Sequence, residues 1–80
     1  MTGPGKSDVD RIQKDLEQLR RLASLAPTDP DTRLAFARKL LDYRKADEAI
    51  LEIRAVIALV PNHLEARKLL ESAHELQLSG

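Results

Sequence analysis

The fold of this 80-residue chain is decided by residues 25–61, LAPTDPDTRLAFARKLLDYRKADEAILEIRAVIALVP. Two stretches with helical spacing of apolar residues lie within it, separated by a short segment at residues 44–46. Pro27 and Pro61 frame the whole stretch. A connection this short forces consecutive helices to run antiparallel. We therefore expect a helical hairpin at the centre of the chain.

Capping residues predict where these two helices begin and end. Asp29 is followed by Pro30, a strong helix start, because the Asp oxygen accepts unpaired amides and Pro at the first helical position loses no hydrogen bond. Pro61 predicts a helix end, because its ring disfavours helical geometry at the residue before it. The expected helices occupy about residues 30–43 and 47–60.

The segments on either side of the hairpin each predict one further helix. Residues 8–25 carry a single narrow apolar stripe, and residues 63–76 are apolar on one side only, as suits a terminal helix. Ser7 and Asn62 each precede an acidic residue by three positions, the spacing of a capping box.

These elements predict an all-α fold of about four antiparallel helices. We expect a flexible leader at residues 1–6, a single helical domain at residues 7–78 and a short tail at residues 79–80. Leu and Ala supply most of the apolar volume, with one Phe, one Tyr and no Trp. Such side chains fill thin layers between helices, which suits stacked helix pairs better than a globule.

Composition excludes several classes of function. Thirteen basic and thirteen acidic residues are interleaved along the chain, whereas nucleic-acid binding needs a concentrated positive field. The chain has no cysteine for a disulfide, a zinc thiolate or a nucleophile. It also has neither an apolar run of ~20 residues nor the apolar core of a secretory signal. We expect a cytoplasmic protein that binds neither membranes nor nucleic acid.

Catalytic and metal-binding patterns are also missing from the sequence. His63 and His74 are eleven positions apart, whereas a metal pair on one helix needs a spacing of three or four. No HExxH motif, Gly-rich phosphate loop or nucleophile–base pairing is present. Acidic residues lie among basic ones on helical faces, a typical solvated arrangement. We therefore expect no enzymatic activity, metal or cofactor, and two histidines at the surface.

The framing prolines, Pro27 and Pro61, define an offset of 34 in the numbering of the chain. At that offset Leu25 falls on Leu59 and Arg33 on Arg67. Leucine-rich amphipathic helices match one another at many offsets, so the apolar matches alone carry little information. The prolines at equivalent helix ends are the informative part. Helix–turn–helix units with this period are typical of the tetratricopeptide repeat.

The stretch resembles that family at several further positions. The residues that carry the resemblance are Phe36, Ala37, Leu40, Asp47, Glu48, Ala49, Ile50, Val56, Leu59, Val60, Pro61 and Asn62. The resemblance implies one complete repeat between two half units, stacked in the right-handed manner of the family. Arg33, Arg44 and Ala46 depart from its usual aromatic, glycine and aromatic residues. The alternative is an unrelated four-helix array with similar caps.

In the family, the first helices of successive repeats line a concave groove that grips a peptide. The resemblance therefore implies a protein- or peptide-binding adaptor, with an apolar floor at Leu34 and Leu41. The alternative is that these two leucines pack on residues 63–76 or on another chain. The positions that match the groove are Asp31, Leu34, Arg38, Leu41, Asp42, Glu65, Lys68, Ser72 and Glu75.

A second hypothesis is structural. The chain is then a self-associating module or an excised part of a longer repeat protein. Residues 8–25 are the expected contact element, because Leu22 and Leu25 point away from the main apolar stripe of that helix.

Overall fold

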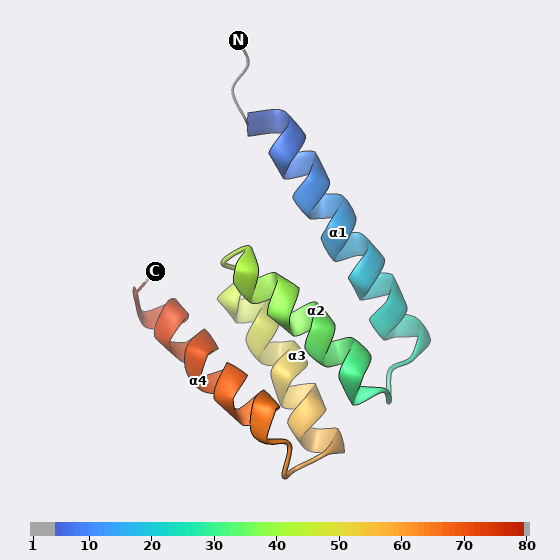
Figure 1. The fold of residues 1–80 in the computed structure, drawn as a ribbon, viewed down its shortest axis with the longest axis vertical. Coiled ribbons are helices and arrows are strands. Elements are labelled where there is room, and N and C mark those ends of the chain that lie inside the picture. Colours follow the sequence, from blue (N-terminus) through green and yellow to red (C-terminus); the bar gives the residue numbers. More distant parts are fainter. Residues whose placement is uncertain (1–4, 80) are drawn as a thin grey trace.

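The computed structural model describes residues 5–79 of the chain, and the side chains of residues 9–79. Within that part, the chain forms four helices and no strand, as the sequence predicted (Figure 1). The helices are α1 (Gly5–Leu25), α2 (Pro30–Asp42), α3 (Ala46–Leu59) and α4 (Leu64–Ser79).

The helix ends at the centre of the chain agree with the prediction to within one residue, and the outer ends do not. Helix α1 begins at Gly5, so Ser7 lies inside the helix and the prediction that it caps the helix is wrong. No proline lies between Gly5 and Ser7 to stop the helix. Helix α4 continues to Ser79, whose hydroxyl donates to the backbone oxygen of Glu75 (2.9 Å). The rest of the predicted leader, residues 1–4, and Gly80 of the predicted tail lie outside the described residues.

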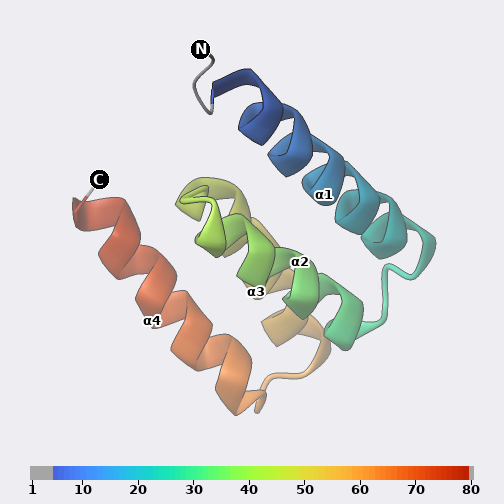
Figure 2. The same ribbon diagram turned by 45° about the horizontal axis from the view of Figure 1, so that its top comes forward.

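Helix α2 lies at the centre of the array. It contacts α1, α3 and α4, and consecutive helices run antiparallel (Figures 1 and 2). Helices α1 and α4 flank the α2–α3 hairpin on opposite sides in both views. The described Cα atoms extend over 49 × 32 × 14 Å, a thin elongated array rather than a globule.

The core lies between α2 and α3. Its largest fully buried side chains are Phe36 and Leu40 from α2 and Ile53 and Val56 from α3. Each contributes about 1.5–3 kcal/mol by leaving water. Ala37 and Ala49 are completely buried as well, and such small side chains allow two helix backbones to approach closely.

The turn between α2 and α3 closes through a left-handed residue. Arg44 has φ of 65°, which lies in the left-handed region that favours glycine. The Arg44 amide donates to the Leu41 carbonyl (3.0 Å) and the Lys45 amide to the Leu40 carbonyl (2.8 Å). Together these two bonds form a Schellman motif, which satisfies the last carbonyls of α2. In this conformation the Arg44 Cβ crowds its own backbone, a cost of about 1 kcal/mol.

We predict that Arg44→Gly raises the free energy of unfolding by about 1 kcal/mol, because glycine removes this crowding. In a domain of this size the melting temperature should rise by roughly 4–8 °C. The control is Arg44→Ala, which removes the same charge and retains Cβ. An equal gain from alanine would show that charge, rather than backbone geometry, is responsible.

Candidate partner-binding surface

The loop between α1 and α2 and the loop between α3 and α4 contain the same pattern of hydrogen bonds. Each bonded residue of the first loop has its equivalent in the second at the offset that separates Pro27 from Pro61. In each loop three backbone bonds and one arginine side-chain bond recur at equivalent positions. The first loop contains Ala26 N–H to Leu22 O (3.0 Å), Asp29 N–H to Ala26 O (3.0 Å), Arg33 N–H to Asp29 O (3.3 Å) and Arg33 Nε–H to Pro27 O (2.8 Å). The second contains Val60 N–H to Val56 O (2.8 Å), His63 N–H to Val60 O (3.0 Å), Arg67 N–H to His63 O (3.1 Å) and Arg67 Nε–H to Pro61 O (2.9 Å).

The arginine in each loop ties the start of a helix back to the proline of the preceding loop. A guanidinium N–H bond to a proline carbonyl fixes the angle at which the chain enters the next helix. Arg33 also binds Glu52 of α3 (2.9 Å), with both side chains largely buried. In the sequence, Arg33 matches Arg67 at the offset and departs from the family's aromatic residue, and neither observation predicts these bonds. The spacing from Pro27 to Arg33, which Pro61 and Arg67 repeat, is the signal that could have revealed its role.

The residues that cap α2 and α4 occupy equivalent positions, but a carboxylate caps α2 and an imidazole nitrogen caps α4. Asp29 caps α2 as predicted, accepting the Asp31 amide (3.1 Å) and the Thr32 hydroxyl (2.8 Å). The prediction that Asn62 caps α4 is wrong, because α4 begins at Leu64 and the cap position falls on His63. The His63 Nδ1 accepts the Ala66 amide (3.2 Å), so His63 has a structural role.

We predict that removal of the two loop arginines destabilises the protein unequally. Arg67→Met should cost about 1 kcal/mol, because it removes one exposed side-chain bond. Arg33→Met should cost about 2 kcal/mol, because it also leaves the partly buried Glu52 carboxylate without its partner. Urea unfolding of both variants measures the difference. If Arg67→Met is the more costly of the two, the role assigned to the Arg33–Glu52 pair is wrong.

The two flanks of α2 contact different helices. Residues on one flank meet α1: the Arg20 guanidinium lies 5.4 Å from the centre of the Phe36 ring, and the Tyr43 hydroxyl donates to Asp15 (2.8 Å). At 100° per residue, Leu34 and Leu41 lie on the opposite flank together with Arg38. Arg38 forms an ion pair with Glu65 of α4. The second flank of α2 therefore faces α4.

This arrangement changes the predicted groove. Leu34 exposes only 3% of its surface, so the prediction that it forms an accessible apolar floor is wrong. It belongs to the same buried cluster as Ala66 and Ala73 of α4, as the alternative interpretation expected. Leu41 packs against that cluster and remains half-buried. When a helix has two apolar flanks, its sequence does not show which of them a neighbouring helix covers.

The other predicted positions are exposed on the two neighbouring helices. With half-buried Leu41 they form what we call the α2–α4 surface: Asp31, Arg38, Leu41, Asp42, Glu65, Lys68, Ser72 and Glu75. The Arg38–Glu65 ion pair crosses this surface and joins its two helices. Both of these side chains are about half exposed, so the pair contributes little to stability and stays accessible to a ligand. The surface is polar and mixed in charge.

The outer side of α4 is polar at the positions that are apolar in α2. At the offset from Pro27 to Pro61, Leu34, Ala37 and Leu40 of α2 fall on Lys68, Glu71 and His74 of α4, and all three α4 residues are exposed. In α2 the equivalent residues are buried against neighbouring helices. Helix α4 therefore offers no apolar face on this side for a further helix to cover.

Tyr43 and Arg20 fasten α1 to the hairpin. Arg20 forms an ion pair with Glu48 of α3 in addition to its contact with Phe36. The hydrogen bond to Asp15 raises the pKa of the Tyr43 hydroxyl above its usual value, and partial burial and the negative charges of Asp15 and Asp42 act in the same direction.

We predict that this bond makes the stability of the protein fall at alkaline pH. A folded-state pKa above the unfolded value means that the stabilisation is complete below the usual pKa of 10.0 and is lost as pH rises through the folded value. Tyr43 is the only tyrosine and the chain has no tryptophan, so phenolate absorbance reports its titration directly. Asp15→Asn should lower the titration midpoint of Tyr43. Identical midpoints would refute the contact.

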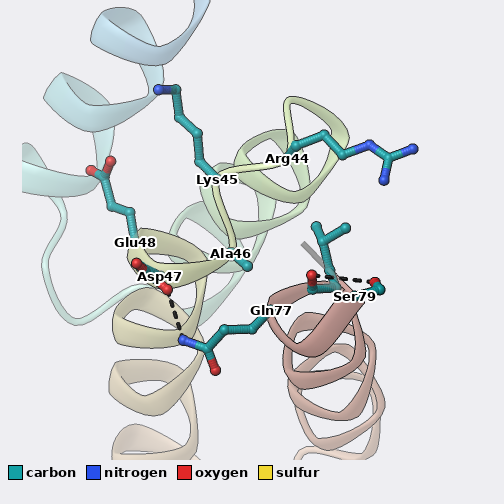
Figure 3. A pocket seen from close by; sticks show the side chains of 8 residues that line it. Arg44, Lys45, Ala46, Asp47, Glu48, Gln77 and Ser79 are labelled. Carbon is teal, nitrogen blue, oxygen red and sulfur yellow. Dashed lines mark hydrogen bonds between the residues drawn. The ribbon is translucent and has the colours of Figure 1, made fainter.

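A shallow cleft of about 530 Å³ lies between the α2–α3 turn and the end of α4 (Figure 3). Arg44, Lys45 and Asp47 line one side, and Gln77 reaches across from α4 to donate to Asp47 (2.7 Å). At the offset from Pro27 to Pro61, Gln77 corresponds to Tyr43, which donates to the carboxylate of Asp15. Gln77 therefore attaches the end of α4 to α3, as Tyr43 attaches the end of α2 to α1, with an amide donor in place of a hydroxyl.

The described residues contain no group of three or more His, Cys, Asp or Glu side chains placed to hold a metal ion. None of the helices in residues 5–79 has both the length and the apolar character needed to cross a bilayer. Comparison of the chain with protein-family models, curated proteins and solved structures gave no significant match.

Proposed function

We propose that this protein is a tetratricopeptide-like adaptor that binds a segment of another protein across the α2–α4 surface. The observation that supports the proposal is the recurrence of the loop hydrogen bonds at the offset from Pro27 to Pro61, which equals the period of that family. An equivalent loop precedes each of α2 and α4, which supports the proposal that these two helices are the corresponding elements of successive units.

The exposed chemistry of the surface suits polar recognition rather than deep burial of an apolar anchor. With Leu34 covered, Leu41 is the apolar contact that remains, and it lies beside Arg38. Asp42 from α2 and Lys68 from α4 offer hydrogen-bonding groups of opposite charge, both exposed. We expect a bound segment to bridge the two helices and to exchange bonds with the Arg38–Glu65 pair. Catalysis is no part of the proposal.

We predict that peptides selected from a random library with the immobilised protein shift the NMR signals of the α2–α4 surface. The double variant Asp42→Lys, Lys68→Glu should weaken their binding at least about tenfold, because it inverts two surface charges while the net charge stays the same. The matched control is Glu17→Lys, Arg54→Glu, which inverts two exposed charges on α1 and α3. Circular dichroism confirms that both variants stay folded.

Signals that move on another face of the molecule would contradict the proposal. So would equal losses of affinity in the two double variants, because the net charge and the fold are matched between them.

A further inference from the structure

Acidic side chains outnumber basic ones on the α2–α4 surface. Four carboxylates and two basic groups give it a formal net charge of −2, and the rest of the chain, whose total is zero, carries +2. The Arg38–Glu65 ion pair neutralises one charge of each sign. The other charged side chains of the surface form no ion pair within residues 5–79, and they are Asp31, Asp42, Lys68 and Glu75. Three carboxylates and one ammonium group are therefore accessible to a ligand.

The excess of carboxylates is greatest toward one end of the surface. Helices α2 and α4 run in the same direction, because consecutive helices are antiparallel (Figures 1 and 2). At the offset from Pro27 to Pro61, Glu75 of α4 corresponds to Leu41 of α2, which directly precedes Asp42. Asp42 and Glu75 therefore lie toward the same end, whereas Lys68 lies near the start of α4. Arg44 lines the cleft beyond this end (Figure 3).

The position of Asp42 is unfavourable for a carboxylate in the free protein. Asp42 is the last residue of α2, where unpaired carbonyls form the negative end of the helix dipole. Lys39 is the basic residue of that turn, and its ammonium group lies 6.0 Å from the centre of the Tyr43 ring, on the flank that meets α1. A cation brought to Asp42 by a ligand offsets the repulsion between the carboxylate and the dipole. This end of the surface therefore favours a cationic ligand.

We propose that the segment bound across the α2–α4 surface is basic, with Lys or Arg side chains placed against Asp42 and Glu75. The inference rests on the proposed function and adds the chemistry of the partner. Complementary charge speeds the encounter and disfavours acidic segments. Half-buried Leu41 precedes Asp42 in the chain, so an apolar side chain next to a basic one in the segment also finds a contact.

The first test uses peptides selected from a random library with the wild-type protein and located on the molecule by NMR. Peptides that shift the signals of the α2–α4 surface should be enriched in Lys and Arg about twofold or more over the unselected library. Peptides that bind this surface without such enrichment overturn the inference and leave the proposed function standing. If no selected peptide binds this surface, both are overturned.

The second test removes the two carboxylates with little change in shape. The double variant Asp42→Asn, Glu75→Gln should weaken binding of the selected peptides about tenfold at low salt. It should also make their affinity less sensitive to added salt, because screening acts on the charges that are lost. The matched control is Asp10→Asn, Glu17→Gln, which removes two exposed carboxylates from α1 and changes the net charge equally. Equal weakening in the two variants overturns the proposal, and circular dichroism checks that both fold.

A change in the peptide supplies a readout that does not depend on a variant of the protein. Replacing Lys and Arg by Glu in a selected peptide should weaken its binding to the wild-type protein about tenfold or more. Undiminished binding of the Glu-containing peptide at the α2–α4 surface would overturn the proposal even if the double variant of the protein failed to fold.

Discussion

The arrangement of the four helices depends on the burial of α2 on three sides. Phe36 faces α1 and Leu34 faces α4. Ala37 and Leu40 are completely buried in the core that α2 shares with α3. The backbone of α2 approaches those of all three other helices, whereas α3 reaches α1 through the Arg20–Glu48 ion pair. The sizes of these side chains therefore set the distances between the helices. Alanine allows two helix backbones to approach closely, and larger side chains fill the space where the backbones lie further apart.

The loops set the angle at which each helix follows the one before it. A proline carbonyl, an arginine six positions later and a cap at the helix start form one local unit, which the chain uses twice. The unit fixes the angle between a helix and its successor through bonds between residues no more than six positions apart. Two copies at the same spacing then place α2 and α4 as corresponding helices, and α1 and α3 likewise. The chemical differences between corresponding helices become informative for the same reason: α4 has exposed polar residues at positions where α2 has buried apolar ones.

The sequence predicted most accurately what local chemistry decides. Asp29 with Pro30 located the start of α2, and Pro61 located the end of α3 to within one residue. The predicted cap of α4 was one residue too early, because Asn is a preferred N-cap residue and His is not. The His63 ring takes this role by accepting the Ala66 amide. The accessibility of Leu34 could not be predicted, because periodicity identifies an apolar flank and leaves open whether a neighbouring helix covers it.

The claim that α2 is the centre of the fold can be tested by native-state hydrogen exchange, measured amide by amide. Amides in α2 near Ala37 and Leu40 should open with the highest free energies in the chain, because their exposure requires separation from three helices. Amides in α1 and α4 should open at lower free energies, because each of these helices can detach while the α2–α3 hairpin persists. Lower opening free energies in α2 than in α1 or α4 would contradict the central place assigned to α2.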